Sequence, residues 1–190
     1  MNVWHEYLTS MGLGGPVGID MPDEKGGLVA NVNYLSRRYK DGWTPSTIMW
    51  NGIGQGDITV TPLQLCNLAA TIANRGFYYI PHVHKNSKSR PLPERYLTPR
   101  RTKVAASAYG PVIAGMRMAV TKGTATVINN PDYPVCGKTG TAENPGKDHS
   151  AFIGFAPMDR PKIAIAVYIE HGVFGADMAA PIACLIMEEY

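Results

Sequence analysis

The segment from Val135 to Glu143 constrains the fold more than any other part of this chain, because it combines glycines with a lysine and hydroxyls. It reads Val-Cys-Gly-Lys-Thr-Gly-Thr-Ala-Glu, and two further stretches typical of strands follow it. A glycine lets another molecule lie flat against the backbone, and a lysine with neighbouring hydroxyls can hold a carboxylate. The segment therefore predicts a substrate-binding strand at the edge of a sheet.

Two other interpretations of the same segment stay open. Gly-Lys-Thr also ends a phosphate-binding loop, but that loop needs a glycine five residues before Gly137, and the chain has Asp132 there. The segment is also compatible with an ordinary hairpin strand that contains glycine and binds nothing.

Three strands are predicted in the last third of the chain, at residues 135 to 142, 151 to 156 and 162 to 170. The third is apolar at nearly every position, so it should be covered on both faces. Short turns rich in Pro, Gly, Asn and Asp separate the strands, which favours antiparallel pairing. Helices are predicted at residues 62 to 75, 107 to 121 and 177 to 187. The fold class is therefore α+β, an antiparallel sheet flanked by helices.

The strongest helix start in the sequence is Thr61-Pro62-Leu63-Gln64. Thr61 can cap the first turn, Pro62 suits the first helical position, and Gln64 completes a capping box. The residues that follow are apolar almost all round, which predicts a buried helix. The glycine-rich stretch from Gly52 to Gly56 precedes this helix, and it has two open interpretations, a tight turn or a segment that lines the site.

Composition excludes several other classes of protein. The 190 residues are 45% hydrophobic and 17% charged, which suits one globular domain, and a net charge of +3 is too small to imply a nucleic-acid partner. Three prolines interrupt the basic segment from Lys85 to Lys103, so a solvated, poorly ordered loop is favoured over a patch for an anionic membrane surface. Cys66, Cys136 and Cys184 indicate neither a disulfide framework nor zinc spacing, and no metal or cofactor is predicted.

The Gly-Lys-Thr-Gly-Thr segment resembles the Lys-Thr-Gly motif of penicillin-binding proteins and serine β-lactamases. Further blocks resemble class B penicillin-binding proteins, of the penicillin-binding protein 2 type, in the same order and at similar spacing. They are residues 50 to 57 leading into 61 to 65, residues 115 to 117 with 123 to 125, and residues 149 to 157. The resemblance spans nearly the whole chain. It implies a β-lactamase/transpeptidase-like fold, of which residues 1–190 are the C-terminal portion.

The resemblance also implies an activity and a setting for the parent protein. In that family, the serine of a Ser-x-x-Lys motif attacks a D-alanyl-D-alanine peptide, and a second peptide's amine resolves the acyl-enzyme. The parent is thus expected to cross-link the stem peptides of peptidoglycan, to bind β-lactam antibiotics and to work with the cell-wall elongation machinery. It is expected to act at the periplasmic face of the inner membrane, held there by an anchor.

Carried onto this chain, the resemblance assigns catalytic roles to Lys138 and Thr141. The cation of Lys138 would attract the terminal carboxylate of the substrate and tune a neighbouring hydroxyl, and the N–H of Thr141 would supply half of an oxyanion hole. Thr139, Gly140 and Thr141 would bind the peptide. His149 lies at the start of the next strand, where it could face the cleft and bind substrate, but a lone histidine in a turn is more often solvated.

The chain departs from the family pattern in one respect, which concerns the nucleophile. None of its serines is followed by lysine three positions later or by asparagine two positions later. Covalent catalysis needs the nucleophile and its base within hydrogen-bond reach, so the chain alone is expected not to acylate. A serine β-lactamase and a non-catalytic penicillin-binding sensor or binding module remain as alternatives to the transpeptidase.

A last expectation concerns the strand at residues 162 to 170. In the family, strands from the beginning of the domain pair beside it. Without them, Ile163 to Ile169 would form an open sheet edge, which is a template for association. The isolated chain is therefore expected either to dimerise through this strand or to exchange its amide hydrogens rapidly there.

Overall fold

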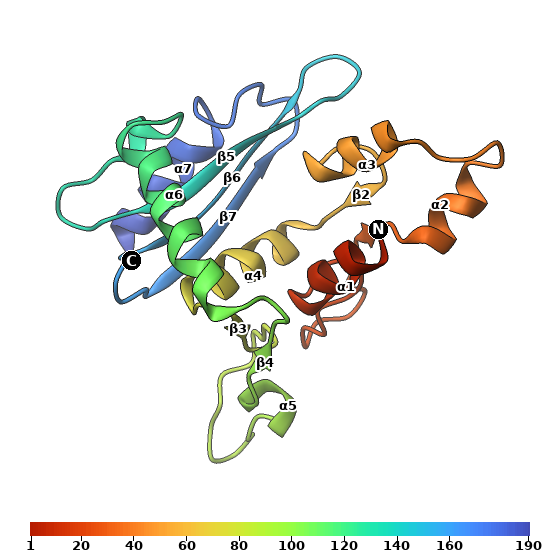
Figure 1. The fold of residues 1–190 in the computed structure, drawn as a ribbon. Coiled ribbons are helices and arrows are strands. Elements are labelled where there is room, and N and C mark those ends of the chain that lie inside the picture. The colour runs from red at the N-terminus through yellow and green to blue at the C-terminus, as the bar shows by residue number, and fades with distance from the viewer. The chain divides into compact units, whose positions relative to one another are not determined.

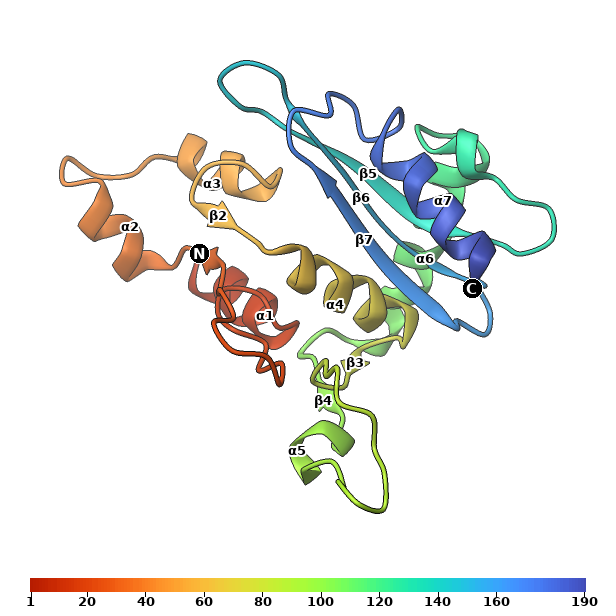
Figure 2. The same ribbon diagram turned by 180° about the vertical axis from the view of Figure 1, so that it is seen from behind.

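The computed structural model describes all of residues 1–190, and the chain divides into two compact units. The first unit comprises Met1–Gln64 and Phe77–Lys103, and the second comprises Leu65–Gly76 and Val104–Tyr190. Figures 1 and 2 show the elements of both units from opposite sides. None of the helices is long and apolar enough to cross a lipid bilayer.

The first unit consists of short elements. Its helices are α1 (Asn2–Ser10), α2 (Val32–Arg38), α3 (Pro45–Gly52) and α5 (Glu94–Leu97). Its strands form two antiparallel pairs, β1 (Leu28–Val29) with β2 (Ile58–Thr59), and β3 (Phe77–Tyr78) with β4 (Arg100–Arg101). The first turn of α4 (Pro62–Ala73) also belongs to this unit.

Little of the backbone of the first unit is paired in regular structure. Hydrogen bonds to the carboxylates of Glu24 and Asp57 stabilise its loops instead. The carboxylate of Glu24 accepts hydrogen bonds from the N–H groups of residues 17 to 19 at 2.6 to 3.2 Å. Asp57 is only 6% exposed and accepts hydrogen bonds from the Tyr39 hydroxyl and the Arg38 guanidinium, both at 2.8 Å. Buried carboxylates of this kind are stable only when they are paired and hydrogen-bonded.

The glycine-rich stretch before α4 forms a turn. Gly54 and Gly56 have φ angles of 83° and 74°, a backbone conformation that glycine adopts without steric cost. This geometry supports the tight-turn interpretation of the stretch from Gly52 to Gly56.

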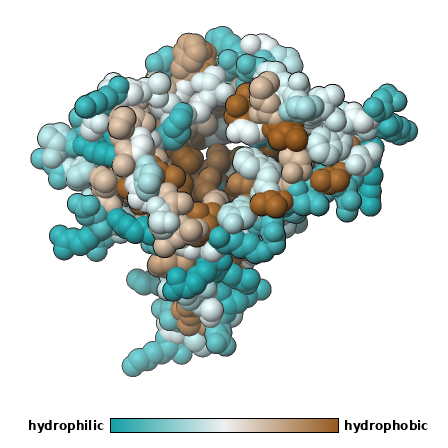
Figure 3. Space-filling view, viewed as in Figure 1, coloured by the Kyte–Doolittle hydropathy of each residue, from teal (hydrophilic) through white to brown (hydrophobic).

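The basic segment from Lys85 to Lys103 is solvent-exposed, as expected, but it is more ordered than expected. All of its lysines and arginines are exposed, and Figure 3 shows the segment as mostly hydrophilic. It nevertheless contains α5 and β4, and Leu92 and Tyr96 within it pack with Ile80 in a small buried cluster. The apolar residues between the prolines therefore anchor this segment, which its charge alone did not indicate.

The predicted capping box at the start of α4 is confirmed. The N–H of Gln64 donates to the Thr61 hydroxyl at 3.2 Å, and the side-chain oxygen of Gln64 accepts from the N–H of Thr61 at 2.9 Å. The amide nitrogen of the same side chain donates to the carbonyl of Gly15 at 2.7 Å. Gln64 is completely buried, so all of these bonds are shielded from water.

Replacing Gln64 with alanine is therefore expected to lower the free energy of unfolding by about 2 kcal/mol, because a helix cap is lost and the partly buried carbonyl of Gly15 loses its hydrogen-bond donor. Urea titration followed by circular dichroism measures the change. Gln64→Glu is the matched variant, since it keeps the acceptor for Thr61 but removes the donor to Gly15. An alanine variant as stable as the parent would contradict this account of the helix start.

The second unit is built on a three-stranded antiparallel sheet in the order β5 (Cys136–Ala142), β6 (His149–Ala156) and β7 (Ile163–Ile169). The rest of α4, together with α6 (Tyr109–Thr121) and α7 (Ala179–Glu189), flanks the sheet. Two 3-10 turns, η1 (Ala106–Ala108) and η2 (Thr126–Ile128), precede and follow α6. The α+β class, the three strands and their antiparallel pairing are confirmed.

Two apolar clusters lie on opposite faces of the sheet, because successive side chains alternate along each strand. On one face, Cys136 and Phe155 pack with side chains of α4 and α6, namely Ala73, Tyr109, Ile113 and Met116. On the other face, Phe152 and Ile165 pack with side chains of α7, namely Ala179, Ala180, Ala183 and Met187. Figure 2 shows α7 along β6 and β7. β7 contributes to both clusters, so it is covered on both faces as predicted.

The start of α7 depends on a residue far away in the chain. Ser150 on β6 is completely buried, and its hydroxyl accepts a hydrogen bond from the N–H of Ala179 at 3.1 Å and donates to the carbonyl of Phe174 at 3.0 Å. The helix begins at Ala179, two residues after the predicted start at Asp177, because a strand hydroxyl caps it instead of a neighbouring side chain.

β7 lies at one outer edge of the sheet, so one side of its backbone has no strand partner. The thiol of Cys66 on α4 contacts the carbonyl oxygen of Ala164 at 3.5 Å, which shows that Ala164 faces the open side. Alternate residues of an antiparallel strand face the same way, so Ala166 and Tyr168 also present their N–H and C=O groups there.

The amide hydrogens of Ala164 and Tyr168 are therefore expected to exchange with solvent much faster than those of Ile165 and Val167, which face β6. Hydrogen exchange measured by NMR tests this alternation, and sedimentation in parallel shows whether a second copy pairs with the strand. A monomer with uniformly slow exchange from Ile163 to Ile169 would contradict the open edge.

Candidate functional site

β5 is the other edge strand, and the side of its backbone that faces away from β6 is open along the Gly-Lys-Thr-Gly-Thr segment. Two carbonyls on that side are bonded by side chains: Arg117 donates to Val135 at 2.9 Å, and Lys138 donates to Thr139 at 2.5 Å. By the alternation of an antiparallel strand, Thr141 also presents its N–H and C=O at this edge. The predicted edge strand is confirmed, and its open backbone can pair with an extended chain.

Lys138 and the two threonines approach this edge from opposite faces of the sheet. Lys138 lies opposite Ile153 in the strand register, and Thr139 lies opposite Phe152. Side chains alternate along a strand, so Lys138 lies on the face that α4 and α6 cover, while Thr139 and Thr141 lie on the face that α7 covers. The sequence predicted that these side chains act together, and the structure brings them to one edge from two sides.

The buried ring of Phe152 lies against two glycines of the β5–β6 pair, Gly137 and Gly154. A Cβ atom added to Gly137 would lie 2.3 Å from the Cζ atom of Phe152, and one added to Gly154 would lie 2.8 Å from it. Phe152 is completely buried and belongs to the cluster beneath α7. Only glycine leaves room for this ring at these two positions. The ring therefore fixes the position of the β5 backbone at Gly137, immediately before Lys138.

The loop that follows β7 packs directly on the backbone of Gly140. A Cβ atom added to Gly175 in this loop would lie 2.6 Å from the Gly140 carbonyl oxygen. His171 and Val173 in the same loop have φ angles of 57° and 64°, a region that is strained for a β-branched residue such as valine. The close approach of Gly175 to Gly140 places this loop beside the site segment.

The structure places His149 away from Lys138, at the opposite end of the β5–β6 pair. Its ring lies 5.4 Å from that of Tyr168 and 5.1 Å from that of His171, centre to centre, and its Nδ1 accepts the N–H of His171 at 3.1 Å. Its partner in the register is Ala142, at the end of β5. His149 therefore supports the loop after β7, and its predicted contact with substrate stays a prediction.

The cysteines do not supply the nucleophile that the serines lack. Burial raises the pKa of the Cys136 thiol to about 11, and it also raises the pKa of the Cys66 and Cys184 thiols. A thiol attacks as the thiolate, and burial disfavours the thiolate of all three side chains, so none of them is an activated nucleophile.

Sequence reasoning missed two residues that hold β5. The hydroxyls of Thr124 and Thr139 lie 2.7 Å apart, and Arg117 on α6 bonds the carbonyl of Val135. Both residues belong to blocks that resemble the family, at 115 to 117 and 123 to 125, but the sequence did not show what they contact.

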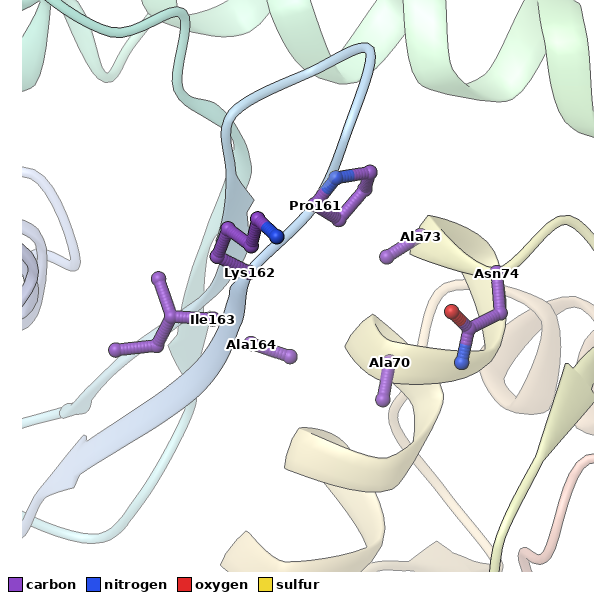
Figure 4. A pocket seen from close by; sticks show the side chains of 7 residues that line it. All are labelled: Ala70, Ala73, Asn74, Pro161, Lys162, Ile163 and Ala164. Atoms are coloured by element: carbon purple, nitrogen blue, oxygen red, sulfur yellow. The ribbon is translucent and has the colours of Figure 1, made fainter.

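A separate small pocket of about 150 Å³ lies between the end of α4 and the start of β7 (Figure 4). Asn74 and Lys162 are the only polar or charged side chains that line it, among Ala70, Ala73, Pro161, Ile163 and Ala164. Two exposed polar groups do not define a ligand, and the pocket lies two strands away from β5.

This fold is that of the penicillin-binding transpeptidases. The family model described as the penicillin binding protein transpeptidase domain matches residues 1–188. The chain belongs to this family, and the relatives it matches include proteins of the penicillin-binding protein 2 (MrdA) type. The expected β-lactamase/transpeptidase-like fold is thereby confirmed.

Individual relatives support this assignment. The chain is 33% identical over 204 residues to peptidoglycan D,D-transpeptidase MrdA of Acinetobacter baumannii, across 96% of this chain and 30% of that protein. It matches Pseudomonas aeruginosa PBP2 in complex with WCK 5153 with a TM-score of 0.88 and 33% identity, across 97% of this chain and 41% of that chain. It matches PBP2 in a complex with MreC from Helicobacter pylori with a TM-score of 0.81 and 25% identity, across 96% and 34% of the two chains. The chain thus spans about a third of the curated relatives it matches.

Proposed function

We propose that residues 1–190 are part of a peptidoglycan D,D-transpeptidase, which cross-links stem peptides through a serine acyl-enzyme. The observation that carries this proposal is the open edge of β5, where an exposed lysine, two threonines and outward backbone groups lie together. Relatives of the chain are named as peptidoglycan D,D-transpeptidases, which favours this activity over that of a serine β-lactamase.

In this proposal, a peptide that ends in D-alanyl-D-alanine pairs as an extra strand along β5, next to Gly140. Lys138 attracts its terminal carboxylate and lowers the energy of the ionised hydroxyl nearby. The hydroxyls of Thr139 and Thr141 hydrogen-bond the carboxylate. The N–H of Thr141 stabilises the oxyanion of the tetrahedral intermediate, and such donors contribute about 3 kcal/mol each in the transition state. His149 would contact a longer peptide further along the pair.

The nucleophile in this proposal comes from a Ser-x-x-Lys segment outside these residues, because no serine of the chain has the required lysine. We also propose that the parent binds β-lactam antibiotics and the cell-wall elongation machinery. A penicillin-binding protein 2 has been solved with MreC, which supports the second of these partners. The parent would act on the periplasmic face of the inner membrane, held by an anchor.

The 190-residue chain by itself is expected to form no covalent adduct with a fluorescent penicillin, since it holds neither an activated serine nor an ionised thiol. Intact-mass spectrometry after incubation with the drug measures the adduct, and the transpeptidase that carries these residues is the positive control. A stoichiometric adduct on the chain would place the nucleophile within residues 1–190. A parent that binds the drug without acylation would support a binding module instead of an enzyme.

A further inference from the structure

The turn after α6 delivers a hydroxyl to the site strand. The Thr124 and Thr139 side-chain oxygens are 2.7 Å apart, which is hydrogen-bond distance for two hydroxyls. Thr124 is exposed and Thr139 is half-buried, so this bond lies at the rim of the site, where a ligand can also reach Thr139.

The neighbours of Thr124 make this turn rigid. A Cβ atom added to Gly123 would lie 2.8 Å from Cα and 2.9 Å from the carbonyl oxygen of Ala119, so only glycine allows the chain to fold back this tightly on α6. The N–H of Ala125 donates to the carbonyl of Ala119 at 3.0 Å, and the side chain of Ala125 is completely buried in the cluster beneath α7. In this turn, Gly123 allows the close approach to α6, Thr124 presents an exposed hydroxyl, and Ala125 anchors the turn in the buried cluster.

A second tether holds the beginning of the same strand to α6. The guanidinium of Arg117 donates to the carbonyl of Val135 at 2.9 Å and to the side-chain oxygen of Asn129 at 3.1 Å. The bond from Arg117 fixes the chain at Val135, before Lys138, and the Thr124 hydroxyl contacts the strand at Thr139, one residue after Lys138. The backbone of β5 is thus set by α6 before any ligand binds.

We propose that Thr124 is a positioning residue for Thr139. A hydroxyl has one proton to donate and can accept two hydrogen bonds. If Thr139 gives its proton to a carboxylate, its bond with Thr124 must be one in which Thr124 donates. Thr124 therefore selects the side-chain rotamer of Thr139 and leaves its proton free for the ligand. The link to carboxylate binding rests on the proposed function, whereas the selection of the rotamer does not.

The rotamer is tested on the 190-residue chain. Three-bond NMR couplings from the methyl carbon of Thr139 to its backbone nitrogen and carbonyl carbon report the population of each χ1 rotamer. In Thr124→Val, the side chain of Thr139 is expected to populate several χ1 rotamers instead of one dominant rotamer. In Thr124→Ser, the dominant rotamer is expected to remain. Thr126→Val, a change at an exposed threonine nearby, is the matched control and is expected to have no effect. Unchanged couplings in Thr124→Val would overturn the proposal.

The consequence for binding is tested in the transpeptidase that carries these residues. Thr124→Val is expected to lower the second-order rate constant of β-lactam acylation roughly 3- to 10-fold, the effect of one hydrogen bond, and Thr124→Ser is expected to restore it. In a Thr139→Val background, Thr124→Val is expected to cause no further loss. An equal loss in both backgrounds would show that Thr124 does not act through Thr139. If Thr139→Val leaves acylation unchanged, the proposed function of Thr139 is wrong, and the NMR couplings still decide the positioning role.

Discussion

Replacing Lys138 with alanine is expected to slow β-lactam acylation of the transpeptidase that carries these residues by about 100-fold or more, which is the effect of removing one preorganised electrostatic contact in a transition state. The side chain is exposed, and its one hydrogen bond in the structure goes to the carbonyl of the next residue, Thr139. Exposed side chains of this kind contribute little to folding, so stability is expected to change by less than about 0.5 kcal/mol. Stopped-flow acylation and thermal unfolding measure the two effects separately.

Two variants sharpen this test. Lys147→Ala removes another exposed lysine, in the turn between β5 and β6, and is expected to leave acylation unchanged. Lys138→Arg keeps the positive charge but replaces a compact ammonium with a planar fork, so it is expected to restore part of the rate. If Lys138→Ala is acylated as fast as the parent, Lys138 takes no part in acylation.

Replacing Gly137 with alanine is expected to lower the free energy of unfolding by about 2 to 4 kcal/mol, because the new methyl group meets the ring of Phe152 in a packed core. The added Cβ would lie 2.3 Å from the ring and 3.0 Å from the Ile153 carbonyl oxygen, so both the ring and the strand would have to move. Urea titration of the 190-residue chain measures the loss.

Gly140→Ala is the matched control on the same strand, since a Cβ there would meet only the Ala151 side chain, at 3.5 Å. That distance is ordinary contact, and stability is expected to change by less than about 1 kcal/mol. Adding Phe152→Leu to Gly137→Ala is expected to recover part of the loss, because a smaller side chain leaves room for the methyl group. A Gly137→Ala chain as stable as the Gly140→Ala chain would mean that the ring does not fix the strand.

The sequence alone predicted correctly those features that depend on residues close together in the chain. The capping box of Thr61 and Gln64 is a contact between residues three apart, so the chain carries the information in one short stretch. The three strands and the open edge at Gly-Lys-Thr-Gly-Thr follow likewise from glycine, apolar runs and short turns, and the ordered blocks identified the family.

Tertiary structure alone decided which residues distant in the chain contact one another. The contact of Thr124 with Thr139, the bond of Arg117 to Val135 and the cap that Ser150 gives to Ala179 join residues between 15 and 29 positions apart. It also decided what surrounds His149, whose ring lies 5.1 Å, centre to centre, from that of His171 in the loop after β7. These contacts depend on how α6, α7 and the sheet pack, and side-chain packing between separate elements leaves no periodic signal in the sequence.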